Sequence, residues 1–437
     1  MRRLLPQSRF LRRMAMLSGG TLAGQLLVVA SSPILTRLYD PPAFGALAVF
    51  SSLLAIFVIA SAFRYEFAIP IARDEEEAVE LVGVCLVSTL MLAVLVTFGV
   101  WLTGPWLAAI TETPALAPLL WLLPLAVLCW GWSLPLSYWS VRQGTFRVNT
   151  TNKLAQGAGQ AGSQLVFGLA GAGAWGLIVG YALGPVVMLV HFVRLLPAHE
   201  RVRMLRLRWE RLWPLARRHW HYPAYSAPSA LLQSSTLLLP AVLLAALYGP
   251  VIAGWFGLGQ RVMALPVKLL GQAASQVFLG EAPKLSNDAE VRRLFLRSTA
   301  GFAALGLLGM APVLMFGPWL FALVFGAGWR EAGLMAAILV PQHLARFVVT
   351  PVSQTLNIYG RQELHLVASL ANGAALVIAF GLGYGAGLEA MTVLMIYSVG
   401  TSLAYALYLG FAWQVVRKGG FQPIAQRQGA AAMEEVS

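Results

Sequence analysis

The sequence predicts an all-α polytopic membrane protein, with about twelve transmembrane helices in two pseudo-symmetric six-helix lobes. The first observation is composition: of 437 residues, 58% are hydrophobic and 11% are charged, whereas soluble domains carry about 25% charged residues. The second is the presence of long runs with few or no charges, such as 82–103 and 229–260, and about 20 apolar residues suffice to cross a bilayer. The third is an internal duplication.

Twelve apolar segments are expected to span the membrane. Their approximate limits are 15–36, 43–63, 80–103, 115–138, 154–171, 173–193, 223–247, 250–276, 298–316, 334–358, 363–383 and 389–412. The first segment follows a cluster of arginines and resembles a signal peptide. Its apolar stretch continues to about Leu35 without an A-x-A site, which favours a retained first span.

Basic residues are distributed unevenly between the two ends of these spans. Of the 31 Lys and Arg residues, 26 fall on the side of the N-terminus. This positive-inside asymmetry predicts that both termini are cytoplasmic. The net charge of +13 is therefore interpreted as a topology signal, and a nucleic-acid partner is not expected.

The duplication is marked by three short motifs that recur in the same order. Leu38-Tyr39-Asp40-Pro41, followed by Gly45, recurs as Leu247-Tyr248-Gly249-Pro250, followed by Gly254. The motif that starts at Gly104 recurs at Gly317, and the motif that starts at Pro135 recurs at Pro351. A unit of six spans is even, so both copies enter the membrane in the same direction as a parallel repeat.

The repeat predicts an N-terminal lobe over 1–194 and a C-terminal lobe over 222–412. The segment 195–221 joins them, and 413–437 forms a polar cytoplasmic tail. The joining segment carries seven arginines together with Trp209, Trp213 and Trp220. Two readings stay open: an amphipathic helix at the cytoplasmic headgroups, or a tether between the lobes.

A polar stripe follows the eighth span. Arg261, Lys268, Gln272 and Gln276 stand at i, i+7, i+11 and i+15, which places them on one helical face. Arg261 lies about 16 Å from the far surface at 1.5 Å per residue. A cation in hydrocarbon costs about 3 kcal/mol on insertion scales, so such residues usually face a watery cavity or a charged ligand.

The tenth span repeats this pattern with His343, Arg346 and Asn357. Arg346 is expected at the same depth as Arg261, since it lies about 18 Å from the same surface at this rise. Two guanidiniums at one depth suit a pyrophosphate, because arginine binds phosphate oxygens through a bidentate fork. The alternative is that each arginine pairs with carbonyls of a neighbouring helix.

Other polar residues are weaker candidates. Gln25 in the first span and Gln233 in the seventh are expected either to line the cavity and meet sugar hydroxyls or to bond between helices. Arg64 and Glu66 flank the cytoplasmic end of the second span, as gating or coupling residues or as a structural salt bridge. No Asp or Glu lies well inside a predicted span.

Several motifs of enzymes and metal sites are absent from the sequence, which excludes the corresponding classes of function. The sequence contains no GxxxxGK[ST], HExxH, CxxC or GxSxG motif, so no enzymatic activity, metal site or bound cofactor is expected. Cys85 and Cys129 both lie in predicted spans and form no disulfide framework.

Several of these segments resemble bacterial polysaccharide-biosynthesis flippases of the O-antigen type, which carry lipid-linked oligosaccharide. The family belongs to the multidrug, oligosaccharidyl-lipid and polysaccharide exporter superfamily. The resemblance rests on Leu35–Tyr39, Arg64–Glu66, Tyr222–Ser229, Gln260–Pro266 with Ser275–Phe278, and Arg346–Ser353.

The resemblance implies that the two lobes form a V around a central cationic cavity, where Arg261 and Arg346 match positions already singled out. It implies transport of polyprenyl-pyrophosphate-linked oligosaccharide from the cytoplasmic to the periplasmic leaflet for O-antigen or exopolysaccharide synthesis. Membrane lipids and other polysaccharide-assembly proteins are the expected partners, and H+ or Na+ is the expected coupling ion. The alternatives are a drug or cation exporter of the same superfamily, a membrane glycan polymerase or ligase, and a non-transporting scaffold.

Overall fold

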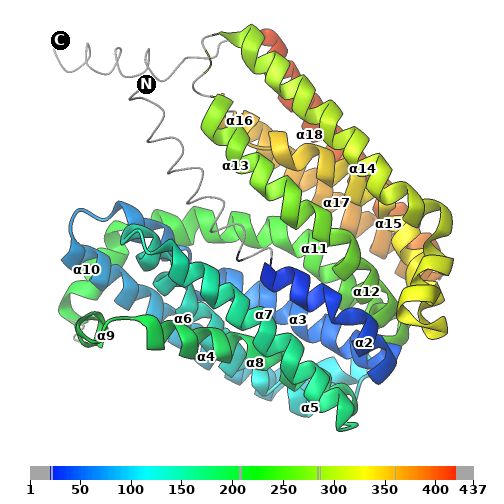
Figure 1. Cartoon of the computed structure of the whole chain (residues 1–437), viewed down its shortest axis with the longest axis horizontal. Coiled ribbons are helices and arrows are strands. Elements are labelled where there is room, and N and C mark those ends of the chain that lie inside the picture. Colours follow the sequence, from blue (N-terminus) through cyan, green and yellow to red (C-terminus); the bar gives the residue numbers. More distant parts are fainter. Residues whose placement is uncertain are drawn as a thin grey trace. The chain divides into compact units, whose positions relative to one another are not determined.

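The computed structural model describes residues 20, 23–205, 209–282, 285, 287–359 and 361–419. Over these residues the chain consists of helices and short connections, without a strand (Figure 1). The parts of the predicted N-terminal and C-terminal segments that lie before residue 20 and after residue 419 fall outside the described residues.

Nine helical segments in the described chain are long and apolar enough to cross a membrane. They are formed by α3 (Pro41–Ser61), α4 (Glu75–Ile110), α5 and α6 (Leu116–Leu119, Leu122–Arg142), α8 (Gly173–Leu195), η2 and α11 (Tyr222–Ser226, Ala227–Tyr248), α14 (Asp288–Phe325), η5 and α15 (Ala327–Trp329, Arg330–Val352), α17 (Gln362–Ala386) and α18 (Ala390–Lys418).

The other three predicted spans are helical where the structure describes them, and each differs from those nine segments. The first is the shorter apolar helix Ala23–Leu38, which ends in α2 (Ser32–Leu38). The second, α7 (Phe146–Leu169), carries many amides. The third is divided into α12 (Pro250–Pro266), a π-helical turn η3 (Val267–Gly271) and α13 (Gln272–Glu281).

The order and length of the helices repeat along the chain, as the sequence motifs predict. The helix α4 has 36 residues and its counterpart α14 has 38, with Pro105 and Pro318 at matching places. In the same way α6 corresponds to α15, α7 to α17 and α8 to α18. This correspondence agrees with the predicted fold class.

The chain divides into two compact units. Unit 1 comprises Met1–Leu258 and Val324–Trp329, and unit 2 comprises Gly259–Leu323 and Arg330–Ser437. The division falls inside α12. The domain limits predicted from the repeat follow a different criterion and stay a prediction.

The helix α3 forms the centre of unit 1. Asp40 caps it by accepting a hydrogen bond from the backbone N–H of Ala43 at 3.1 Å, and Pro41 occupies its first turn. Its residues are apolar on every side, which is typical of a buried helix. Phe50 and Leu54 are accordingly buried completely.

The repeat motifs meet each other inside unit 1. A Cβ atom on Gly45 of α3 would overlap the carbonyl oxygen of Pro250, and a Cβ on Gly254 of α12 would overlap the carbonyl oxygen of Pro41. The contact is therefore reciprocal: each glycine receives the first-turn carbonyl of the other helix. Only residues without a side chain permit the two backbones to come this close.

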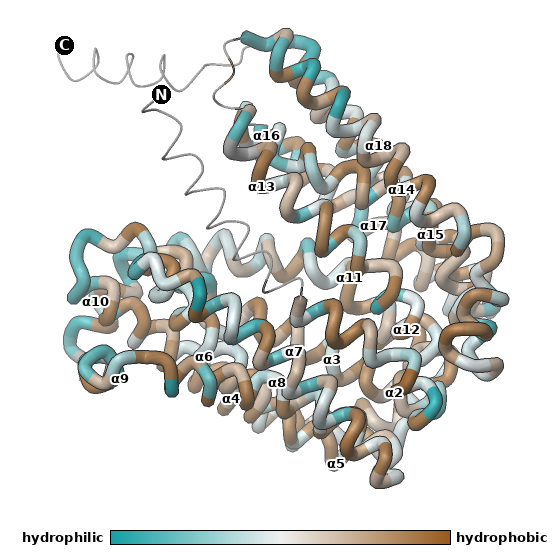
Figure 2. The backbone as a smooth tube through the Cα atoms, in the orientation of Figure 1, coloured by the Kyte–Doolittle hydropathy of each residue, from teal (hydrophilic) through white to brown (hydrophobic). Residues whose placement is uncertain are grey.

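The basic segment 195–221 contains two helices, α9 (Ala198–Leu205) and α10 (Trp209–Arg218), which pack on unit 1. Met204, Leu212 and Leu215 are buried in one apolar cluster with Trp139 and Ile69. Figure 2 shows hydrophilic residues gathered near α9 and α10. The segment is thus a folded part of unit 1.

Ion pairs hold this segment on the acidic first turns of α4. Arg211 contacts Glu76 at 2.7 Å and Glu80 at 3.2 Å, and Arg218 contacts Glu77 at 3.3 Å. Arg203 contacts Glu75 at 2.5 Å. The arginines that the sequence assigns to a topology signal therefore also have specific structural partners.

Unit 2 is organised around α15. Met335, Ala336 and Leu339 are buried completely. The side-chain amide of Gln342 donates to the hydroxyl of Tyr397 on α18 at 3.1 Å. Arg261 and Arg346 both belong to this unit.

Candidate functional site

Two helical segments of unit 2 carry the predicted binding residues, and they lie side by side in parallel. The imidazole Nε2 of His343 on α15 lies 2.9 Å from Oε1 of Gln260 on α12. Further along both segments, the hydroxyls of Ser275 and Ser353 lie 3.3 Å apart. Because the contacts follow the same order on both segments, α12–η3–α13 and α15 run in the same direction.

This register brings Arg261 and Arg346 to similar heights. Arg261 follows Gln260 by one residue, and Arg346 follows His343 by three. At about 1.5 Å per residue, the two arginines differ by about 3 Å along the helix axes. They are therefore within one helical turn of each other, as their expected depth in the membrane requires.

Three cations lie along these two segments. Lys268 follows Arg261 by seven residues, about two helical turns, and Arg346 lies on the neighbouring segment. Lys268 is exposed, and the two arginines are half-buried. Among the described residues, the Arg346 guanidinium has no carboxylate partner and forms no hydrogen bond. Like charges on adjacent segments repel each other, so an anion near Arg346 would lower that repulsion.

His343 is buried, with 2% of its surface exposed. Both ring nitrogens have partners, because Nδ1 lies 3.0 Å from the carbonyl oxygen of Leu339 and Nε2 contacts Gln260. Its evident role is to hold α12 against α15 beside Arg261. A direct contact between His343 and a glycan stays a prediction.

The remaining cavity candidates are distributed over both units. Gln272 is exposed at the start of α13 in unit 2. Gln276 and Asn357 lie in helices, but their side chains are outside the described part of the structure. Gln25 is half-buried and Gln233 is exposed, both in unit 1. Their roles as cavity residues stay predictions.

Arg64 and Glu66 form a second polar site, in unit 1. They lie where α3 ends and the short 3-10 helix η1 (Tyr65–Ile71) begins. Arg64 has a left-handed backbone, with φ of 67°, an uncommon conformation for a residue with a side chain. Its guanidinium lies 3.8 Å from the Glu66 carboxylate and 4.7 Å from the centre of the Phe67 ring.

The Glu66 carboxylate is the most unusual polar group of unit 1. It is 3% exposed, and its Oε2 atom has no hydrogen-bond partner among the described residues. Burial raises its pKa, although its own backbone hydrogen bond and the Arg64 charge act in the opposite direction. A buried carboxylate with one free oxygen can accept a proton without breaking an existing hydrogen bond.

Sequence reasoning missed a buried polar seam on α7. The seam consists of residues at i, i+3, i+4, i+7, i+11 and i+15, namely Asn149, Asn152, Lys153, Gln156, Gln160 and Gln164. Asn152 is 3% exposed and Gln164 is fully buried. The Lys153 ammonium lies 3.4 Å from Oε1 of Gln156. The helical spacing was visible in the sequence, but the predicted span began one residue after Lys153 and excluded the cation.

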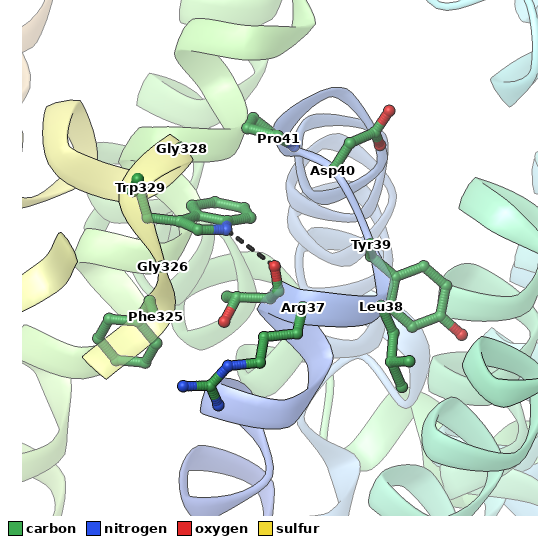
Figure 3. A pocket seen from close by; sticks show the side chains of 11 residues that line it. Arg37, Leu38, Tyr39, Asp40, Pro41, Phe325, Gly326, Gly328 and Trp329 are labelled. Carbon is green, nitrogen blue, oxygen red and sulfur yellow. Dashed lines mark hydrogen bonds between the residues drawn. The ribbon is translucent and has the colours of Figure 1, made fainter. Parts of the chain in front are cut away.

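A cavity of about 550 Å³ lies elsewhere in unit 1, between the end of α2 and the loop before α15. Figure 3 shows that Trp329 closes one side of it and donates from its indole nitrogen to the carbonyl oxygen of Thr36, at 3.1 Å. Trp329 also packs edge-on against Phe44, with ring centres 4.8 Å apart. None of the predicted site residues lines this cavity. The contacts of Trp329 with Thr36 and Phe44 explain why Val324–Trp329 belongs to unit 1.

Comparison with known proteins identifies the family and the fold. Residues 34–333 match the family model of polysaccharide biosynthesis proteins. A search of curated proteins finds no match.

Among solved structures, the lipid II flippase MurJ in an inward closed conformation matches with a TM-score of 0.71 and 11% identity. That match covers 92% of this chain and 87% of MurJ. An inward-facing multidrug resistance MATE family transporter of the MOP superfamily matches with a TM-score of 0.68 and 15% identity. It covers 93% of this chain and 95% of that transporter.

These structural likenesses confirm the predicted fold class, an all-α polytopic membrane protein. The matched structures are described as a flippase and a transporter. The family match covers more than half of the chain. The chain belongs to the polysaccharide biosynthesis protein family, with the helical fold of MOP-superfamily transporters.

Proposed function

We propose that the protein is a flippase for polyprenyl-pyrophosphate-linked oligosaccharide. It would move this lipid from the cytoplasmic to the periplasmic leaflet of a bacterial inner membrane, for O-antigen or exopolysaccharide synthesis. The observation that carries the proposal is that Arg261 and Arg346 stand at similar heights on two adjacent, parallel segments of unit 2, with Lys268 further along the first of them. Family membership and the fold shared with a lipid II flippase support it.

The chemistry of these cations suits a pyrophosphate better than a neutral or cationic cargo. Guanidinium groups bind phosphate oxygens through paired hydrogen bonds, and the ammonium of Lys268 adds a third positive charge. The lipid tail would stay in the bilayer, while exposed amides such as Gln272 would meet sugar hydroxyls. Alternating access would come from one half of the duplicated chain moving against the other.

A drug or cation exporter is the second candidate, because the fold is shared with a multidrug transporter. Binding a cation in a membrane favours carboxylates at mid-helix. In the described spans, Asp and Glu occur only near helix ends, as at Glu75–Glu80 and Asp288–Glu290. This distribution favours an anionic cargo.

Reconstitution of the purified protein into vesicles tests the function. A fluorescent short-chain polyprenyl-pyrophosphate oligosaccharide is placed in both leaflets, and a reducing agent that cannot cross the bilayer is added outside. We expect the bleached fraction to rise from about half towards completion only in vesicles that contain the protein. Bleaching that stops at the outer leaflet, together with uptake of a lipophilic cationic dye, would favour the exporter.

Glu66 is proposed to take part in coupling through protonation, with Arg64 as its partner. Because burial raises its pKa, the folded protein holds more protons than the unfolded chain between the ordinary value of 4.5 and the raised pKa. Stability therefore falls as pH rises through this window. The variant Glu66→Gln is expected to lose this dependence and to stay at least as stable at pH 7.

The same substitution should remove the pH dependence of flipping in the vesicle assay, because glutamine cannot titrate. Glu210→Gln is a suitable control, since Glu210 is exposed on α10 in the same unit. A Glu66→Gln protein whose flipping rate still follows pH as the unmodified protein does would exclude Glu66 from coupling.

A further inference from the structure

A second basic site lies in unit 2, at the ends of two helices outside the predicted binding region. A cavity of about 490 Å³ opens between the first turns of α14 and the last turn of α18. Four arginines line it, namely Arg292, Arg293, Arg297 and Arg417. Among the described residues that line it, Asp288 supplies the only carboxylate.

The wall of this cavity is held by packing beneath it. Phe295 and Val416 are each 2% exposed, within one apolar cluster. The Arg292 guanidinium lies 5.2 Å from the centre of the Trp413 ring, a cation–π distance. Trp413 in turn lies 6.1 Å from Phe295. These contacts of Phe295, Val416 and Trp413 hold α14 against α18. Arg293, Arg297 and Arg417 are not needed for that packing.

The charges of the cavity are not balanced by the protein itself. Arg293, Arg297 and Arg417 form no ion pair or side-chain hydrogen bond within the described part of the chain. Asp288 is engaged, because it accepts a hydrogen bond from the Tyr359 hydroxyl at 3.1 Å. The arginines of α10 provide a contrast, since Arg211 and Arg218 contact glutamates of α4.

The position along α14 indicates the depth of the cavity in a membrane. The first large apolar side chain of α14 that is exposed, Leu296, lies in the cavity wall and is 45% exposed. Leu305, Leu307 and Leu308 continue this exposed apolar surface, as expected for a helix that faces lipid. Figure 2 shows the meeting ends of α14 and α18 as hydrophilic. The arginines therefore stand at the level of the lipid headgroups.

We propose that this cavity binds the phosphate headgroup of a lipid. Basic pockets between membrane helices at the headgroup level suit anionic lipids, and Arg293 with Arg297 can present two forks to phosphate oxygens. The phosphate could belong to an anionic phospholipid of the surrounding leaflet or to a polyprenyl pyrophosphate. The site is separate from Arg261 and Arg346 and does not depend on the proposed transport activity.

Binding is measured on the purified full-length chain in neutral detergent, with thermophoresis as the readout. Four probes are titrated: short-chain phosphatidylglycerol, short-chain phosphatidylcholine, a short-chain polyprenyl pyrophosphate and inorganic phosphate. We expect saturable binding of at least one anionic lipid, and weaker binding of phosphatidylcholine and inorganic phosphate. Preference for phosphatidylglycerol would identify a resident phospholipid, and preference for the pyrophosphate would identify a loading point for cargo.

Two triple variants test the arginines. In Arg293→Gln, Arg297→Gln, Arg417→Gln, the dissociation constant should rise about fivefold per arginine, or about 100-fold in total. The corresponding Arg→Lys triple keeps the charge but loses the forks, so it should bind more weakly than the unmodified protein. A matched control, Arg147→Gln, Arg194→Gln, Arg201→Gln, removes equal charge from exposed positions in unit 1 and should bind normally.

Three results would overturn the proposal. One is an equal loss of binding in the unit 1 control, which would mean diffuse attraction by net charge. Another is full binding by the Arg→Lys triple, and the third is the absence of saturable binding of both anionic lipids. The Arg261→Ala, Arg346→Ala protein should still bind phosphatidylglycerol, so failure of the transport proposal would leave this site untouched.

Discussion

A protein in which both Arg261 and Arg346 are replaced by alanine is expected to insert into the membrane at normal levels and to export no surface polysaccharide. The two residues lie at similar heights on parallel helices, and Arg346 has no carboxylate partner among the described residues. Hydrogen bonds to charged groups contribute about 1.5–3 kcal/mol each. Loss of one guanidinium should therefore weaken pyrophosphate binding about 10- to 100-fold.

The single variants separate the geometry of the guanidinium from its charge. Arg261→Lys and Arg346→Lys should each reduce export, because lysine keeps the charge but cannot form a bidentate fork. Arg330→Ala serves as the control, since Arg330 is exposed at the first residue of α15. Surface polysaccharide is measured by blotting, and insertion is measured by the amount of protein in the membrane fraction. Undiminished polysaccharide in the double alanine variant would refute the binding site.

The second large effect is expected from the reciprocal contact between α3 and α12. Gly45→Ala and Gly254→Ala should each reduce the yield of folded protein strongly, and by similar amounts. In both cases the added methyl group would overlap a backbone carbonyl, that of Pro250 or Pro41. A carbonyl in a helix cannot rotate away, so the helices must separate, at a cost of about 1–3 kcal/mol or more.

Other membrane-helix glycines provide the matched control. Gly99 in α4 and Gly301 in α14 have no atom within 4 Å of a Cβ placed on them. Gly99→Ala and Gly301→Ala should therefore be neutral or stabilising, because alanine favours the helix by about 0.5–1 kcal/mol. Thermal unfolding in detergent, followed by size-exclusion chromatography, compares the four proteins. A Gly45→Ala protein as stable as Gly99→Ala would show that the helices are not held at this distance.

The sequence predicts the helical segments well, because apolar runs and loop motifs are local signals. It does not predict how α12 gives way to a π-helical turn at Val267–Gly271, since that depends on packing against α15. The seam on α7 was missed because amides such as Gln164 lower the hydropathy of a helix that is nevertheless buried. Helical spacing predicts that Arg261 shares one face with the other polar residues of its span. It does not predict the contacts of both His343 ring nitrogens with Leu339 and Gln260.

The joining segment 195–221 shows most clearly which contacts cannot be predicted from the sequence. Its arginines predict a cytoplasmic location, but their pairing with Glu76, Glu77 and Glu80 depends on where α4 begins. These arginines and glutamates are more than 130 residues apart in the sequence. Pairs so far apart produce no periodic pattern from which their contact could be predicted. The apolar residues Leu212 and Leu215, which bury one face of α10, are too few to distinguish a docked helix from one lying on lipid.

The meeting of Gly45 with Pro250 and of Gly254 with Pro41 has a consequence for the origin of this chain. The first turn of one helix in each repeat contacts the matching glycine of the other, which is the reciprocity that defines an isologous contact. Two copies of a single six-helix repeat could make the same contact through this one glycine. A one-repeat protein that retains such a glycine beside its second helix is therefore expected to assemble as a dimer.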